Sequence, residues 1–578
     1  MPGFTAIISN EKPIASDFKF REKNIYGLEN RYVRRRISGN GFVVEQFVNQ
    51  KFPNDKVFAE DADFVAGIDG AILNLTYLQN KTNSQTAFEM LKKLYFAENE
   101  DFVKHLRGSF SGFIFDKKEK RWTIFADATG GKRIFFYKNN DLLFFSSELK
   151  EISFLLSKFN LNKNLNRNAA YFLLTCGFML EDNTLLENVK RLMPGNMLII
   201  NNNKLETKEF FHLKNIQKTS LCKTEIIETM DSLFSEAVRL QFEKDKENDY
   251  QHIATLSGGL DSRMTVLTAH KLGYTEQLNF TFSQSDYLDE KIAKRIAIDH
   301  HHDFLFHSLD YGNYLKNIDK TVFYNDGLIL YSGGAHIFNA VEDINLNRYG
   351  IVHTGLIGDA VIGSFLSVPR AIKPAVEMGI HSKVLLPEIQ HVITEITQKY
   401  ETEELYKFYS RAFLGAMNGA LFLDIFSETA SPFLNLDFLA FCYSIPEHLK
   451  YKEQIYIEWI GKRHREFDGY IWEKTGVSPL KSNNYKKYCS LGYYNRMSGK
   501  FFDRMSGKTK SGMNPFDRWL IENISLKNYI ENYFSRNISV LDKHEKLQTQ
   551  CRFAFQTGNS QDKFIVLTLL AAIKLHFE

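Results

Sequence analysis

Short apolar runs separated by polar turns fill the first third of the chain. The runs span four to six residues, and the segments between them are rich in Asp, Asn, Gly and Lys. This pattern predicts β-strands, while helical spacing near Gln85–Phe96 and Arg167–Cys176 predicts two helices. Together these elements are typical of an antiparallel, layered α+β domain. The predicted strands are Phe4–Ile8, Phe64–Ile68, Phe110–Phe115, Trp122–Phe125, Ile134–Tyr137, Leu142–Phe145 and Met197–Ile200.

A polar stretch rich in Asn and Lys, Asn201–Asn215, predicts a linker, and the pattern changes after it. Apolar residues recur at helical spacing over Lys223–Lys244, which predicts a helix with one face in a core. Strands then alternate with helices, which predicts a parallel sheet. Beyond Tyr311 we expect mostly helices and one further strand at Tyr349–Thr354. The alternating elements are strand His252–Leu256, helix Ser262–Leu272, strand Gln277–Phe282, helix Leu288–Asp299 and strand Phe304–Ser308.

Length and composition narrow the class of protein. A chain of 578 residues is too long for one core, and roughly two to four domains are expected. The net charge of +3 gives no reason to expect nucleic acid or a membrane surface as a partner, and no apolar run approaches the ~20 residues of a membrane span. The five cysteines are scattered without a CxxC pair, which argues against zinc and a disulfide framework. With an N-terminus that lacks a signal layout, these features favour the cytoplasm.

The segment Ser257-Gly258-Gly259-Leu260-Asp261-Ser262 lies between a predicted buried strand and a predicted helix. Adjacent glycines let backbone amides approach an anion, and the start of a helix adds the positive end of its dipole. The serines supply hydroxyl donors, and Asp261 can hold a Mg²⁺ ion that bridges phosphates. The string differs from the GxxxxGK[ST] phosphate loop. It resembles the pyrophosphate-binding loop of the ATP pyrophosphatases, which split ATP into AMP and pyrophosphate.

Within that group, the chain resembles the class B asparagine synthetases and their relatives, the β-lactam synthetases and lasso-peptide cyclases. The resemblance implies an Ntn-hydrolase-like αββα sandwich in residues 1–205. It implies an α/β parallel-sheet synthetase domain of the ATP-pyrophosphatase type, with a helical C-terminal lobe, in residues 216–578. The segments that carry the resemblance, in chain order, are Leu106–Asp116, Ala126–Tyr137, Phe145–Lys150, Thr184-Leu185, Leu192–Gly195, Asp286–Ala293, His301-His302, Thr354–Asp359, Ser431–Leu434, Ser444–Pro446 and Lys474–Val477.

The resemblance implies ATP and Mg²⁺ as cofactors and assigns residues to them. Asp261 and Asp359 are the expected Mg²⁺ ligands, although Asp359 could instead cap a helix. Lys474 is the expected electrostatic catalyst. Arg263 directly follows the loop and could contact substrate or phosphate, and a solvent-facing role on the helix surface stays equally open. The expected nucleotide-binding residues are Leu256 near the adenine, Ser257, Gly258, Gly259, Asp261 and Ser262 at the phosphates, and Phe282, Gly355 and Gly358.

Several positions depart from the family pattern. Leu356 stands where asparagine synthetases carry Glu and β-lactam synthetases carry Tyr, so that Glu428 and His353 become the candidate bases. Pro2 stands where working glutaminases of the family carry the nucleophilic Cys. The family's Asn-Gly-Glu appears as Asp69-Gly70-Ala71, and its Arg-Gly-Pro-Asp loop has no counterpart beyond Arg36–Gly39. We therefore expect an inactive glutaminase domain that serves as a support or as a binding module.

The leading hypothesis is an AMP-forming ligase that joins a substrate carboxylate to a substrate amine, as in macrolactam, lasso-peptide or β-lactam biosynthesis. The expected partner is a small molecule or peptide, and a homodimer or a biosynthetic partner protein stays open. An ammonia-dependent synthetase acting on aspartate or a sugar acid is the second hypothesis, and a non-catalytic binding protein is the third. A metal site at His300–His302 is disfavoured because adjacent side chains point in different directions. The stretch Ser498–Met513 is expected to be a mobile loop.

Overall fold

Two six-stranded antiparallel sheets form the N-terminal part of the computed structural model, which describes residues 2–9, 13–22, 31–201, 204–482 and 512–578. The strand order is β10-β8-β9-β1-β3-β2 in one sheet and β12-β11-β7-β6-β5-β4 in the other. The strands are β1 (Gly3–Ser9), β2 (Tyr32–Gly39), β3 (Phe42–Asn49), β4 (Phe58–Glu60), β5 (Phe64–Ile72), β6 (Gly108–Asp116), β7 (Arg121–Ala126), β8 (Phe135–Lys138), β9 (Leu142–Ser146), β10 (Val189–Arg191), β11 (Asn196–Asn201) and β12 (Lys204–Glu209).

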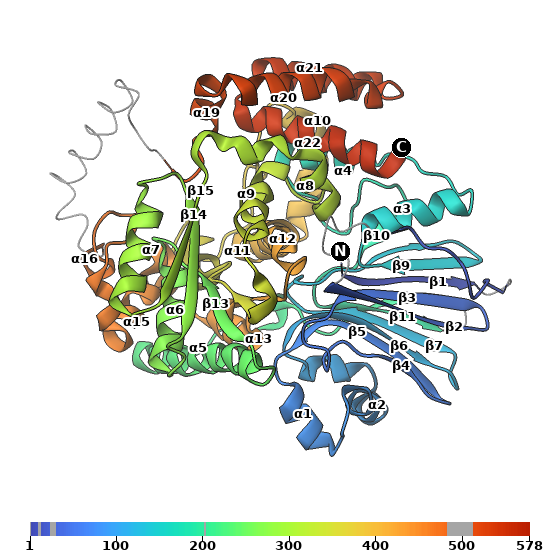
Figure 1. The fold of residues 1–578 in the computed structure, drawn as a ribbon, viewed down its shortest axis with the longest axis horizontal. Coiled ribbons are helices and arrows are strands. Elements are labelled where there is room, and N and C mark those ends of the chain that lie inside the picture. Colours follow the sequence, from blue (N-terminus) through green and yellow to red (C-terminus); the bar gives the residue numbers. More distant parts are fainter. Residues whose placement is uncertain (1, 10–12, 23–30, 202–203, 483–511) are drawn as a thin grey trace.

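These sheets pack face to face, and helices cover both outer faces (Figure 1). Alternate side chains of both sheets, such as Phe4, Phe113 and Trp122, form the core between them. Helices α1 (Leu75–Thr82) and α2 (Ala87–Glu98) cover the second sheet, and α3 (Leu149–Lys158) covers the first. The layers therefore follow the αββα order that the sequence led us to expect.

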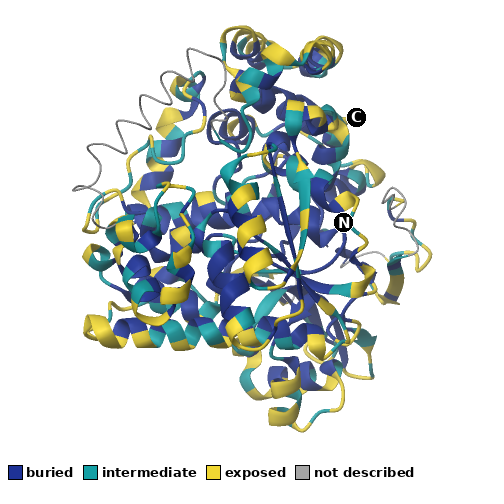
Figure 2. Ribbon diagram, turned by 60° about the vertical axis from the view of Figure 1, so that its left-hand side comes forward, coloured by how far each residue is buried: buried dark blue, intermediate teal, exposed yellow. Residues whose placement is uncertain are grey.

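A five-stranded parallel sheet with the order β15-β14-β13-β16-β17 lies beside the sandwich (Figure 1). Its inner strands are buried, as is usual when helices cover both faces of a parallel sheet (Figure 2). The predicted alternation of strands and helices and the predicted strand at Tyr349–Thr354 are confirmed. The elements are α5 (Lys223–Lys246), β13 (Gln251–Thr255), α6 (Leu260–Lys271), β14 (Gln277–Ser283), α7 (Leu288–Asp299), β15 (Asp303–Ser308), β16 (Tyr349–His353) and β17 (Thr429–Ala430).

Helices make up most of the remaining described chain, as expected beyond Tyr311. The last of them, α22, is apolar on nearly all sides and buried over most of its length, and a capping box of Asn559 and Asp562 starts it. The helices are α4 (Arg167–Cys176), α8 (Ile318–Asn325), α9 (Tyr331–Glu342), α10 (Leu386–Gln398), α11 (Glu403–Lys407), α12 (Leu421–Asp424), α13 (Leu436–Ser444), α14 (Glu447–Lys450), α15 (Gln454–Arg463), α16 (Pro479–Ser482), α19 (Phe516–Glu522), α20 (Ile524–Asn537), α21 (Glu545–Thr557) and α22 (Ser560–Phe577).

The linker predicted at Asn201–Asn215 is wrong for part of its length. Residues Lys204–Glu209 form β12, which pairs antiparallel with β11 at the edge of the second sheet. An edge strand whose side chains face solvent carries no apolar pattern, and this explains why its sequence looked like a linker. The mobile loop predicted at Ser498–Met513 lies almost wholly outside the described residues.

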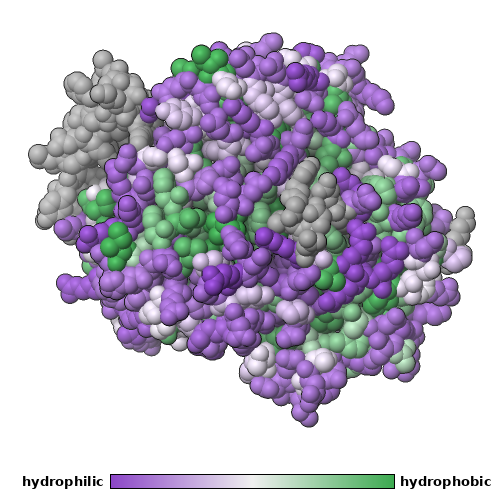
Figure 3. Space-filling model, in the orientation of Figure 1, coloured by the Kyte–Doolittle hydropathy of each residue, from purple (hydrophilic) through white to green (hydrophobic). Residues whose placement is uncertain are grey.

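The sandwich and the parallel-sheet part are joined by polar contacts. The guanidinium group of Arg107 donates two hydrogen bonds of 2.8 Å to the carboxylate of Asp437, and the Asp326 carboxylate accepts from the Leu149 N–H at 3.1 Å. Hydrophilic side chains cover most of the face drawn in Figure 3, with hydrophobic ones grouped over β14 and β15. Among the described helices, none has both the length and the apolar character needed to cross a membrane.

Candidate functional site

The serine and glycine loop follows the central strand of the parallel sheet, between the end of β13 and the start of α6. Ser262 Oγ accepts a hydrogen bond of 3.0 Å from the Ser257 N–H and lies 3.0 Å from Ser257 Oγ. A Cβ atom at Gly258 would come within 2.8 Å of the Glu473 side chain, and so this close approach requires glycine. The loop thus lies at the carboxyl end of the sheet, where open α/β proteins bind ligands.

Asp261, in the first turn of α6, lies next to Asp359, which follows β16. Its Oδ2 accepts a hydrogen bond of 2.9 Å from the Asp359 N–H, and its Oδ1 accepts one of 3.0 Å from the Tyr456 hydroxyl. Burial raises the pKa of Asp261 well above its usual value, and the negative charge of Asp359 raises it further. Two neighbouring carboxylates, one from the first turn of α6 and one from the loop after β16, provide hard oxygen ligands that suit Mg²⁺, and a bound cation would offset their repulsion.

Glycines allow the Asp359 loop to approach Asp261. A Cβ atom at Gly358 would lie 2.5 Å from Asp261 Cγ, and one at Gly355 would lie 2.3 Å from the Ser262 nitrogen. Asp359 precedes the helical turn Ala360–Ser364, yet its side chain makes no capping hydrogen bond. This geometry does not support the alternative role of Asp359 as a helix cap.

Lys474 reaches the same region from the segment before α16. Its Nζ forms an ion pair of 2.8 Å with Glu453, and its side chain stays 54% exposed. Burial raises the pKa of Glu453; the ammonium of Lys474 opposes the rise, and the negative charge of Asp359 adds to it. The next residue back, Glu473, donates its N–H to the Gly258 carbonyl oxygen at 3.1 Å. The structure therefore brings Lys474 close to the loop with about half of its side chain exposed and its ammonium paired with both carboxylate oxygens of Glu453.

Two acidic residues at the loop were not found from the sequence. Asp289, in the first turn of α7, accepts a hydrogen bond of 2.8 Å from the Gly258 N–H, and Glu473 accepts one of 2.6 Å from the Tyr287 hydroxyl. Burial raises the pKa of Asp289 to about 6, although the hydrogen bond from Gly258 opposes the rise, and the charge of Glu473 adds to it. Asp289 lies within Asp286–Ala293, one of the segments that carry the family resemblance, but the sequence assigned it no role; its contact with the loop, like that of Glu473, depends on how distant segments pack.

Of the other residues predicted near the nucleotide or the substrate, two are buried and one is partly exposed. Leu256 is buried, and its N–H donates to the Phe280 carbonyl oxygen at 2.9 Å, so that its side chain belongs to the core. Phe282 is partly exposed near the end of β14, with its ring 5.2 Å from that of His336. Arg263 is buried, and its guanidinium donates to backbone oxygens of Tyr470 at 3.2 Å and Ile471 at 2.7 Å. These bonds, with one of 3.4 Å to the Gly258 carbonyl oxygen, give Arg263 a structural role beside the loop, and its burial contradicts the solvent-facing alternative.

Neither candidate base lies free at the site. Glu428 is buried, and its two carboxylate oxygens form ion pairs with Lys56 at 2.7 Å and Lys132 at 2.8 Å. Burial would raise the pKa of Glu428, but the two ammonium groups lower it to about 2. His353 is also buried, with Nε2 2.7 Å from Asp245 and its ring stacked on Phe242. The structure thus contradicts the expectation that Glu428 is a base, because a carboxylate so strongly paired cannot accept a proton near neutral pH.

A cavity of about 50 Å³ lies between the sandwich and the parallel-sheet part. Leu356, at the position where a family base was sought, lines it together with Thr354 and Ser431, while Ser109 and Gly131 line it from the sandwich. Leu73, Met417 and Ala420 make much of the remaining wall apolar. The cavity therefore reaches the loop that carries Asp359 from the side of the N-terminal domain.

The pocket expected to be a degenerate glutaminase site is nearly filled. A cavity of about 10 Å³ remains there, which is room for about one water molecule. Both Asp69 carboxylate oxygens are buried without a hydrogen-bond partner, and Lys132 Nζ lies 3.9 Å away. The cavity is lined by Pro2, Asp69, Ser111, Lys132, Arg133, Ser147 and Asp424.

Comparisons with known proteins give a match to one domain family and to asparagine synthetases. Residues 58–211 match the family described as a glutamine amidotransferase domain. A Methanocaldococcus jannaschii protein provisionally named glutamine-hydrolysing asparagine synthetase 2 is 26% identical over 366 residues, which cover 61% of this chain and 69% of that protein. Glutamine-hydrolysing asparagine synthetase 1 of Bacillus subtilis is 20% identical over 415 residues, which cover 68% of this chain and 64% of that protein. The matches thus span about two thirds of these relatives.

Solved structures give weaker likenesses. Glutamine phosphoribosylpyrophosphate amidotransferase from B. subtilis, complexed with ADP and GMP, is 13% identical with a TM-score of 0.22, covering 47% of this chain and 58% of that one. A structure described as the allosteric regulatory enzyme of purine biosynthesis is 10% identical with a TM-score of 0.23, covering 53% of this chain and 74% of that one. Such low scores carry no argument about the fold or the site.

Proposed function

This chain belongs to the class B asparagine synthetase superfamily, and from that premise we propose that it forms an amide bond by adenylating a substrate carboxylate. In the first step a carboxylate oxygen attacks the α-phosphorus of ATP, and pyrophosphate leaves. In the second step an amine attacks the acyl carbon, AMP leaves, and the amine releases a proton. A carboxylate needs this activation because it is a poor acyl donor by itself.

The observation that carries the proposal is the contact between Asp261 and Asp359 beside the glycine loop. Backbone amides of Gly258 and Gly259 and the hydroxyls of Ser257 and Ser262 would hold the phosphates at the start of α6. The two aspartates would hold Mg²⁺, which supplies positive charge to the pyrophosphate leaving group. The ammonium of Lys474, on a half-exposed side chain, would offset charge on the α-phosphate and on the tetrahedral adduct.

The nucleophile is proposed to be an amine of the substrate itself. Ammonia from glutamine would need a working glutaminase, and the cavity at Pro2 and Asp69 is too small for a glutamine molecule. An apolar residue, Leu356, stands where asparagine synthetases carry Glu and β-lactam synthetases carry Tyr, which argues against the dedicated asparagine reaction and also against a ring closure driven by either side chain. The lack of room for glutamine in that cavity is therefore what supports a substrate amine, as in specialised-metabolite or peptide biosynthesis of the macrolactam or β-lactam type.

The test incubates the protein with ATP, Mg²⁺ and a panel of molecules that carry both a carboxylate and an amine. We expect pyrophosphate and AMP to form in equal amounts only with the right substrate, and mass spectrometry should show a product lighter by one water. Asp261→Ala should abolish the reaction, whereas Asp303→Ala, at an exposed position, should not.

Formation of ADP, or full activity of Asp261→Ala, would contradict the proposal. Activity that requires added ammonium, with aspartate or a sugar acid as the carboxylate, would instead identify an ammonia-dependent synthetase. Binding of the nucleotide without turnover of any substrate would favour a non-catalytic protein.

A further inference from the structure

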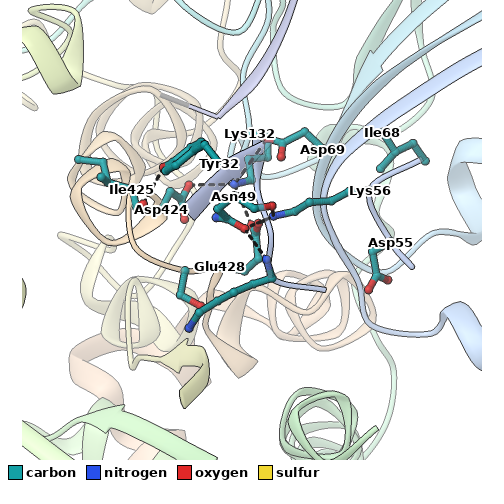
Figure 4. A network of polar contacts seen from close by, with 12 residues as sticks. Tyr32, Asn49, Asp55, Lys56, Ile68, Asp69, Lys132, Asp424, Ile425 and Glu428 are labelled. Atoms are coloured by element: carbon teal, nitrogen blue, oxygen red, sulfur yellow. Dashed lines mark hydrogen bonds and ion pairs between the residues drawn. The ribbon is translucent and has the colours of Figure 1, made fainter. Parts of the chain in front are cut away.

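The N-terminal domain holds Glu428, a residue of the other domain, between two lysines. Lys56 follows β3, and its Nζ lies 2.7 Å from Glu428 Oε1; Lys132 follows β7, and its Nζ lies 2.8 Å from Glu428 Oε2. All three side chains are almost fully buried. Figure 4 shows how the two lysines reach toward Glu428 from separate segments of the sandwich. Each oxygen of the carboxylate thus has its own cation from the neighbouring domain.

The ion pairs of Glu428 with Lys56 and Lys132, called the clamp below, are part of a larger set of contacts between the two domains. Lys132 also lies 3.3 Å from Asp424, and Lys56 donates to the Asn49 carbonyl oxygen at 3.2 Å. The Tyr32 hydroxyl donates to the Ile425 carbonyl oxygen at 2.6 Å (Figure 4). Buried ions with several fixed partners have little freedom to move, because every displacement leaves a charge without a partner. The segment from Asp424 to Glu428 is therefore fixed relative to the sandwich.

Glu428 lies directly before the short strand β17, which pairs with β16. The Glu428 carbonyl oxygen accepts from the Val352 N–H at 2.8 Å, and the Ala430 carbonyl oxygen accepts from the Thr354 N–H at 2.9 Å. One residue further, the Ser431 hydroxyl donates to the Leu356 carbonyl oxygen at 2.9 Å. A continuous set of hydrogen bonds thus runs from the clamped glutamate to the start of the loop that carries Asp359.

The loop in turn contacts the start of α6. The Thr265 hydroxyl lies 3.2 Å from the Thr354 carbonyl oxygen and 3.1 Å from that of Asp261. The Asp359 N–H completes the contact with its hydrogen bond to Asp261. The spacing between the two aspartates therefore depends on where β17 holds the loop.

From these contacts we infer that Lys56 and Lys132 are positioning residues for the metal site of the synthetase domain. They act through Glu428 and β17 on the loop of Asp359, and this role gives the N-terminal domain a function that needs no glutaminase chemistry. The inference rests on the proposed function, because it assumes that Asp261 and Asp359 bind a divalent cation with ATP. It places the control of metal affinity in a domain that contributes no metal ligand.

The test measures binding of Mn²⁺ to the full-length protein by electron paramagnetic resonance, with and without ATP. Lys132→Met is expected to weaken Mn²⁺ binding in the presence of ATP by about 5- to 30-fold. It should change the affinity for ATP in the absence of metal by less than about 2-fold, because the glycine loop itself is untouched. Lys56→Met removes the other cation that pairs with Glu428 and is expected to weaken Mn²⁺ binding in the same way.

Lys190→Met is the matched control. It removes one positive charge from the same domain, at an ion pair with Asp182 in which each side chain is 43% exposed. If Lys132→Met does not fold, Ser431→Ala tests the last step, because it removes only the hydrogen bond to Leu356. Equal Mn²⁺ affinity of Lys132→Met and Lys190→Met, or of Ser431→Ala and the unaltered protein, would overturn the inference. Absence of Mn²⁺·ATP binding by the unaltered protein would instead overturn the proposed function.

Discussion

The backbone N–H of Asp359 donates a hydrogen bond of 2.9 Å to the carboxylate of Asp261, across 98 positions of the chain. This bond orients one proposed metal ligand by means of the backbone of the other. It also holds two carboxylates close together in a place where burial already raises the pKa of Asp261. The site is thus arranged for a cation at a cost in stability when no cation is bound.

Asp261→Asn should make the metal-free protein less sensitive to pH. The folded-state pKa of Asp261 lies above its unfolded value, so that the folded protein binds this proton more tightly. The stability of the unaltered protein should therefore fall as the pH rises above about 4, the pKa of an Asp in the unfolded chain, and on through the raised pKa of the folded state. The amide carries no charge and removes this fall. Thermal unfolding in EDTA, from about pH 5 to about pH 8, checks the difference in slope.

The same variant should lose the stabilisation that Mg²⁺ and ATP give to the unaltered protein, since ligand binding to the folded state raises its stability. Asp303→Asn serves as the control, because this residue is exposed at the start of β15. An Asp261→Asn protein that Mg²⁺ and ATP stabilise as strongly as the unaltered one would show that Asp261 is not a metal ligand.

Lys474→Met should slow pyrophosphate release without weakening nucleotide binding. The lysine ammonium is proposed to act on charge that develops in the transition state, and loss of such a group costs about 10²- to 10³-fold in kcat. The affinity for Mg²⁺ and ATP should change by less than about 3-fold, because the phosphates are held by the loop. Steady-state rates and calorimetric titration separate the two effects.

Lys481→Met removes a positive charge from an exposed position nearby and should leave both quantities unchanged. If Lys474→Met mainly raised the dissociation constant of ATP, the lysine would bind the ground state and would have no special role in the chemical steps.

Asp289→Asn should strengthen the binding of Mg²⁺ and ATP above about pH 6 and have little effect below it. The Asp289 carboxylate now accepts the Gly258 N–H that the phosphates are proposed to use. With a pKa of about 6, this group is charged at higher pH, where it repels an incoming phosphate. Binding titrations at several pH values should show the two proteins converging as the pH falls.

Asp286→Asn is a close control, because Asp286 is exposed three positions earlier and has a positive φ that Asn also tolerates. Weaker binding by Asp289→Asn at high pH would contradict the prediction and would place Asp289 among the groups that hold the metal.

The parts that could be predicted from the sequence are those whose chemistry is local. Ser257 to Asp261 are contiguous, so that the strand, the turn and the helix start could be inferred together. The structure places Asp359 next to Asp261 and pairs Lys474 with Glu453, and their roles stay predictions. Asp289 lies within the family-like segment Asp286–Ala293 but received no role, and Glu453 was not singled out, because only the packing of distant segments shows their contacts at the site. Glu428 was misassigned for the same reason, since its partners Lys56 and Lys132 belong to the other domain. The edge strand β12 was not predicted, because its side chains are not buried and leave no apolar pattern in the sequence.

The last prediction concerns glutamine. Pro2→Cys should not create glutaminase activity, although it places a thiol where the family has its nucleophile. Lys132 and Asp69 occupy the pocket, and the remaining cavity of about 10 Å³ is far below the roughly 300 Å³ of small-ligand pockets. A coupled assay for glutamate should therefore detect no release from glutamine with either protein. Hydroxylamine supplied directly, with ATP and the substrate, provides the positive control for the synthetase half. Glutamate release by Pro2→Cys would contradict this prediction. It would show that the pocket opens to admit glutamine and that the N-terminal domain lacks glutaminase activity only because the thiol is missing.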